Sequence, residues 1–90
     1  MKTIKNKDKY YRQSSFPLVN FLFSHGEQVV GINATDRPGQ KEFAFISTAR
    51  LEELVEIYLY GPKDHPDLQV NVRDYEQARR QLLDLLKNNN

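Results

Sequence analysis

The chain contains no cysteine, and this absence excludes disulfide bonds, cysteine-ligated zinc and thiol catalysis. Its two histidines, His25 and His65, have no second ligand at metal-binding spacing. The four glycines do not form the GxxxxGK or GxGxxG pattern that surrounds bound phosphate groups. We therefore expect no metal, no cofactor, no enzymatic activity and no small-molecule substrate.

Long apolar runs are missing as well. No stretch approaches the roughly 20 apolar residues that a membrane-spanning helix needs. The first residues, MKTIKNKDKYYRQ, lack the apolar segment that follows the charges of a secretory signal peptide. We expect a cytoplasmic protein that makes no membrane contact.

What is present is typical of an ordinary globular chain. Of the 90 residues, 39% are hydrophobic and 28% are charged, which is enough for one small core but not for two. The net charge of +1 is unevenly spread, because residues 1–13 carry five basic residues against a single acid. The remainder is slightly acidic. We therefore divide the chain into a basic N-terminal arm (residues 1–13), a single domain (residues 14–87) and a disordered polar tail (residues 88–90).

The first half of the domain reads as a helix followed by two strands. SSFPLVNFLFSHG predicts a helix that a serine caps and that Gly26 ends. EQVVGIN and KEFAFIS then read as the strands of an antiparallel hairpin around a turn at residues 37–40. Gly31 marks a bulge or a close helix crossing in the first strand. In the second strand, Phe43 and Phe45 lie on one face.

The second half predicts two further helices. Thr48 caps the segment TARLEELVEIYLYGP and Gly61 stops it, while Asn71 caps the last helix. The predicted fold class is therefore α+β, a two-stranded antiparallel hairpin packed against three helices in the order α-β-β-α-α. Because a two-stranded sheet is marginal by itself, the helices supply most of the core.

The last helix contains two adjacent arginines that the helical phase separates. At roughly 100° per residue, Arg79 falls inside the apolar stripe and Arg80 falls on the polar face. We expect Arg80 to pair with the acids one turn away. Arg79 has to extend its charge to solvent or meet an acid. This favours a structural bridge between helices, and the alternative is a functional arginine at the edge of a binding surface.

The first helix predicts a protein-interaction surface. Its apolar residues offer more surface than one face of a hairpin covers, so part of that surface should be exposed unless a partner buries it. We expect the partner to be another protein or a second copy of the chain, most simply as a homodimer. The interface residues predicted in this way are Leu18, Phe21, Leu22 and Arg79.

Nucleic-acid binding is the alternative function, and the basic arm is its basis. Lysines interleaved with tyrosines suit phosphate neutralisation and base stacking, and the last helix adds a basic stripe. The residues predicted to contact nucleic acid are Lys5, Lys7, Lys9, Tyr10, Tyr11, Arg12, Arg73 and Arg80. Two other interpretations of the arm are a disordered solubilising terminus and an edge strand whose tyrosines pack on the domain.

The order of these landmarks resembles a small uncharacterised domain family found in bacteria, phages and other mobile elements. The motifs that carry the resemblance, within residues 11–87, are Gly26, Gly31-Ile32, Phe43-Ala44-Phe45, Tyr58-Leu59-Tyr60-Gly61, Val70 and Ala78-Arg79-Arg80-Gln81-Leu82. The chain departs from the family in a longer hairpin loop and an extra His-Pro in the second loop. The family has no assigned reaction or catalytic residue. The resemblance therefore implies only an accessory protein linked to phage, plasmid or defence biology.

Overall fold

The computed structural model describes residues 9–88, which form an α+β fold. In chain order its elements are β1 (Tyr10–Gln13), α2 (Phe16–Ser24), β2 (Val29–Ala34), β3 (Lys41–Ile46), α3 (Ala49–Tyr60), the 3-10 helix η1 (Pro66–Leu68) and α4 (Val72–Asn88). The predicted α+β class is confirmed. Among these described helices, none has the length and apolar character needed to cross a membrane.

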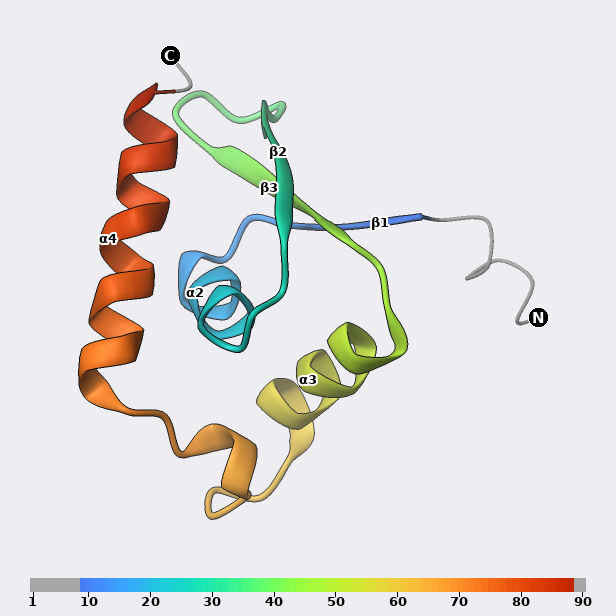
Figure 1. Cartoon of the computed structure of the whole chain (residues 1–90). Helices are drawn as coiled ribbons and strands as arrows, with labels where there is room; N and C mark the ends of the chain where they lie inside the picture. The colour runs from blue at the N-terminus through green and yellow to red at the C-terminus, as the bar shows by residue number, and fades with distance from the viewer. Residues whose placement is uncertain (1–8, 89–90) are drawn as a thin grey trace, which may run out of the picture.

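The sheet has three strands where the sequence predicted two. β1 pairs antiparallel with β3, from Tyr10 opposite Ile46 to Gln13 opposite Phe43, so the strand order is β1-β3-β2 (Figure 1). The predicted order α-β-β-α-α is therefore wrong at its start, and the sheet begins inside the segment expected to be a basic arm. An edge strand was one interpretation of the arm, but the predicted order left it out because YYRQ is short and has tyrosines at two successive positions, which hides the alternation of a half-buried strand.

The pairing register sorts the side chains of the sheet into two faces, because successive residues of a strand point to opposite sides. One face, which includes Phe43 and Phe45, packs into the core together with Tyr11, Val29 and Ile32. We call the opposite side the outer face; it carries Tyr10, Arg12, Gly31, Asn33, Glu42, Ala44 and Ile46. The register of β2 shifts between Val29 and Gly31, so the bulge that the glycine predicted is present.

α2 is the centre of the core. Its Phe16 ring packs edge-on against Phe43 of the sheet with ring centroids 6.1 Å apart. Its Phe21 ring lies 5.2 Å from the ring of Tyr58 in α3, and α4 packs along another side. Figure 1 shows α2 between α4, α3 and the sheet. Neighbours on several sides explain why the sequence of this helix is apolar around most of its circumference.

The predicted signals at the helix ends are confirmed with one exception. Thr48 Oγ1 accepts a hydrogen bond from the backbone N–H of Leu51 at 3.0 Å, and Gly26 has a positive φ of 92° just past α2. At the start of α2, however, Ser15 makes no side-chain capping bond. The side chain of Gln13 instead accepts from the backbone N–H of Ser15 at 3.0 Å, so β1 itself fixes where α2 begins.

Candidate functional site

The interface predicted on the first helix is not exposed. Leu18 is 3% exposed, Phe21 4% and Leu22 0%, so the expected apolar surplus of α2 is wrong. The physical reason is that α3 and α4 cover sides of α2 that a hairpin alone would leave open. In this conformation the three side chains belong to the core and do not face a partner.

Arg79 is exposed and lies outside the buried stripe of α4. The helix buries Ala78 and Leu82, with Tyr75 and Leu86 half-buried. Around the helix axis, the centre of the arc formed by these four residues is rotated by roughly 45° from the centre of the apolar stripe that the sequence predicted. Because α4 packs mainly against α2, only a narrow arc is covered. The expected burial of Arg79 is therefore wrong, and both arginines face solvent.

The residues of the basic arm are divided by the end of the sheet. Lys5 and Lys7 lie outside the described residues. Lys9 and Tyr10 are exposed, whereas Tyr11 is half-buried and belongs to the side chains packed against the core. Of the earlier interpretations of the arm, the edge strand with a packed tyrosine therefore describes residues 10–13.

The two arginines of α4 that were predicted to contact nucleic acid do not share a surface with this segment. Arg73 and Arg80 lie on α4, which runs along the opposite side of the molecule from the start of β1 (Figure 1). Arg12 lies on the outer face, with its Nε 3.9 Å from Glu42 Oε1. The predicted basic stripe and the arm are therefore separate, and part of the charge at β1 is balanced within the sheet.

The outer face has an apolar end where β1 begins. Tyr10 and Ile46 lie directly opposite each other on β1 and β3, and they are 45% and 42% exposed. The next pair along the same face is Arg12 opposite Ala44. The face therefore passes from an exposed apolar pair to an arginine two residues along β1.

A groove lies on the other side of the sheet, between Tyr11 of β1 and α3. It has a volume of about 480 Å³ and is lined by Tyr11, Ala49, Glu52, Glu53, Val55 and Glu56. Its apolar surface comes from the tyrosine, the alanine and the valine, and its acidic rim comes from α3. Arg50 reaches Glu53 at 2.9 Å and offsets part of that charge. We call this feature the edge groove.

The outer edge of β1 carries backbone groups that point away from the sheet. The Lys9 carbonyl accepts from the Ser47 N–H at 2.9 Å. In an antiparallel ladder the direction of the backbone groups alternates along the strand, so the N–H and C=O groups of Tyr10 and Arg12 point outward. Within residues 9–88 no strand pairs with this edge. Such an edge is a template for another strand.

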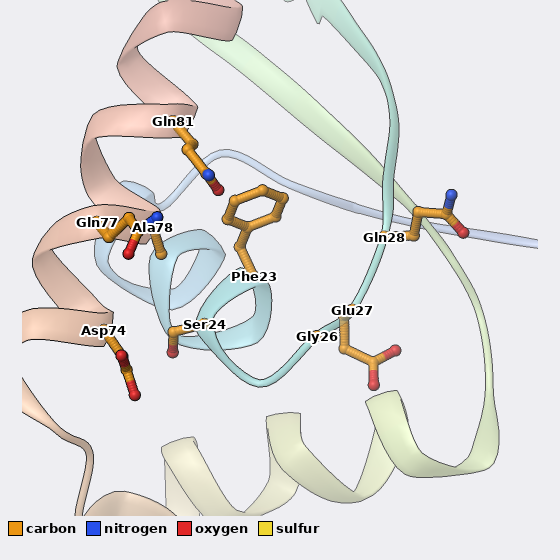
Figure 2. Close-up of a pocket in the computed structure, with 9 residues that line it drawn as sticks. All are labelled: Phe23, Ser24, Gly26, Glu27, Gln28, Asp74, Gln77, Ala78 and Gln81. Atoms are coloured by element: carbon orange, nitrogen blue, oxygen red, sulfur yellow. The ribbon is translucent and has the colours of Figure 1, made fainter.

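A second cleft lies between the end of α2 and α4 (Figure 2). It has a volume of about 350 Å³, and its lining includes Phe23, Glu27, Gln28, Gln77 and Gln81. Figure 2 shows the Gln81 amide directed toward the Phe23 ring, whereas Glu27 and Gln28 point away from it. The cleft offers amide groups to a ligand, and its lining also includes Ser24 and Asp74. The Ser24 hydroxyl donates to the Phe21 carbonyl at 2.8 Å.

The two histidines, far apart in the sequence, both contact Asp67. His25 Nε2 donates to the Asp67 carbonyl at 2.9 Å, because a carbonyl oxygen only accepts. His65 Nδ1 accepts from the Asp67 N–H at 3.0 Å. Both rings bind backbone groups and fix the loop between α3 and α4. No group of three or more histidine or acidic residues within residues 9–88 is placed to hold a metal ion.

Comparison of the chain with models of protein families, with curated proteins and with solved structures finds no match. The resemblance to a phage-associated domain family therefore stays a prediction.

The outer face and the edge groove were missed from the sequence. The position of the α3 glutamates beside Tyr11 depends on β1, which the predicted order of elements did not include. The alternation of Tyr11 and Gln13 with exposed Tyr10 and Arg12 was the available signal, but four residues are too few to distinguish it from chance.

Proposed function

We propose that this chain is a small non-enzymatic protein-interaction module, whose contact surface is the outer face of the sheet where β1 meets β3. The observation that carries the proposal is the exposed pair of Tyr10 and Ile46. Large apolar side chains that remain exposed together, beside an open strand edge, are typical of protein-contact surfaces. An accessory role in a mobile element, which the family resemblance suggests, would suit such a module.

Site-specific photo-crosslinking tests this function. A photoreactive amino acid in place of Ile46 should form a discrete adduct with a protein partner or with the chain itself, and Tyr10→Lys should abolish that adduct. Asp64 lies exposed in the loop after α3 and provides the matched control position. Equal labelling at positions 46 and 64, or an adduct that Tyr10→Lys does not change, would contradict the proposed surface.

Nucleic-acid binding is the second candidate, supported by the exposed Lys9 and Tyr10. It is weaker because Arg12 lies near Glu42 and the arginines of α4 lie elsewhere. Binding of single-stranded DNA or RNA through phosphate contacts has to weaken steeply as the salt concentration rises. A salt titration checks this, and no binding at low salt excludes the candidate.

A further inference from the structure

We propose that the partner is a second copy of this chain, which adds its β1 to the open edge of β1 and places its basic arm in the edge groove. The proposal rests on the proposed function, because it names the partner of that surface. The result is a twofold dimer in which two three-stranded sheets become one.

The backbone supports an antiparallel pairing centred on Tyr10. The outward-pointing groups of one copy belong to Tyr10 and Arg12, and those of the second copy belong to the same residues. With Tyr10 opposite the partner's Tyr10, Arg12 lies opposite the partner's Asp8, which lies outside the described residues. In this register the numbers of two opposite residues differ by an even number. The outward-pointing backbone groups of one strand therefore meet those of the other, as hydrogen bonding between the two edges requires. The pair of Arg12 and Asp8 also has opposite charges, which favours cross-strand pairing.

The charges on the side of the sheet that faces the helices support the same register. There the partner's Lys9 falls beside Tyr11, which lines the edge groove together with Glu53 and Glu56. The sequence before β1 alternates as Lys5-Asn6-Lys7-Asp8-Lys9, so an extended chain puts its lysines on one side and its asparagine and aspartate on the other. The lysines would face the acidic rim of α3, and the aspartate would face Arg12.

The proposed pairing has further consequences for the two sheets. A twofold axis at Tyr10 lays Lys9 of one copy beside Tyr11 of the other. The same axis joins Tyr10 and Ile46 of both copies into one apolar patch on the outer face. It also brings the acidic rims of the two α3 helices toward each other, and their like charges repel. Lysines between the two rims would offset this repulsion.

Sedimentation of the full chain over a micromolar concentration range is the first measurement. The expected result is a reversible dimer of twice 10.6 kDa. Arg12→Pro removes an outward N–H that β1 does not use for pairing with β3, and proline is tolerated at such an edge. Arg12→Ala keeps this N–H and is the matched control. Arg12→Pro should raise the dissociation constant at least about tenfold above that of Arg12→Ala, while both variants stay folded by circular dichroism.

A charge exchange tests the edge groove separately. Lys9→Glu and Glu56→Lys should each weaken the dimer about tenfold, and the double variant should recover most of the loss. Glu76→Lys changes an exposed acid on α4 by the same charge and should leave the dissociation constant unchanged.

Three results would overturn the inference. The first is a wild-type mass that stays near 10.6 kDa at every concentration. The second is equal behaviour of the two Arg12 variants. The third is a double charge variant whose dimer is no tighter than the dimers of the two single variants. A dimer that Tyr10→Lys dissociates but that the Arg12 and charge variants do not affect would overturn this pairing and leave the proposed contact surface standing.

Discussion

Asp67, in the loop between α3 and α4, joins three parts of the chain through one residue. Its carboxylate lies 3.2 Å from Arg50 Nη1, and its backbone N–H and carbonyl contact His65 and His25. The hydrogen bond from Arg50 lowers the pKa of the Asp67 carboxyl below its ordinary value of 3.8, with partial loss of solvent acting in the opposite direction. A solvent-exposed ion pair of this kind orients a loop more than it stabilises a core.

The lowered pKa predicts a pH dependence of folding. Because the pKa of Asp67 is lower in the folded chain than in the unfolded chain, its contribution to stability is present above about pH 3.8 and is lost as the pH falls through the folded pKa. Arg50→Ala should raise the folded pKa back toward the ordinary value, whereas Arg73→Ala should not. NMR titration of the Asp67 carboxyl carbon measures this, and an unchanged pKa in Arg50→Ala would contradict the assigned cause.

At the scale of elements, α4 shows how a neighbour decides which part of an apolar stripe is buried. Its sequence offers leucines over a wide arc, yet Leu82 is buried while Leu83 and Leu85 are exposed. One neighbouring helix covers less of the circumference than a sheet and a helix together. The buried face of α4 was predicted from all of the leucines and was therefore placed too close to Arg79.

This shift predicts unequal effects of two neighbouring substitutions. Leu82→Ala should lower the free energy of unfolding by about 2–5 kcal/mol, because it leaves a cavity between α4 and α2. Arg79→Ala, at an exposed position, should change that free energy by less than about 0.5 kcal/mol. Urea denaturation of both variants gives the comparison, with Arg80→Ala as a second exposed reference. A loss of more than about 1 kcal/mol in the free energy of unfolding for Arg79→Ala would indicate that Arg79 is buried, as the sequence predicted.

At the scale of the whole molecule, β3 is the centre around which the layers are arranged. It pairs with β1 on one side and β2 on the other, and Phe43, Ala44 and Phe45 are all buried. α2 packs on its inner side, so the most buried strand meets the most buried helix. The two outer strands each keep one open edge within the described chain.

This arrangement predicts the order in which backbone amides exchange with solvent. The N–H of Ala44, which points toward β2, should be among the slowest to exchange, because it lies in the longer ladder between β2 and β3. The N–H groups of Tyr11 and Phe45 point toward each other's strands. They should exchange faster, because a local opening of the short edge strand β1 frees both. Hydrogen exchange followed by NMR measures both. In the proposed dimer, protection of the outward N–H groups of Tyr10 and Arg12 should increase with protein concentration.

The sequence by itself determined the α+β class, all three helices and both strands of the hairpin. These signals are local: Thr48 and Asn71 cap helices through their own side chains, and Phe43 and Phe45 are spaced for one face of a strand. A cap or an alternation acts over a few residues, so it is readable without knowing what packs nearby.

Only the tertiary structure decided which apolar surfaces are covered. It made Tyr10–Gln13 a third strand, enclosed α2 on several sides and left Arg79 in solvent. It also placed the acids of α3 beside Tyr11. Each of these depends on which segments meet across long separations in the chain. An apolar stripe indicates that a helix packs against other elements. The number and position of those elements set the width of the buried arc.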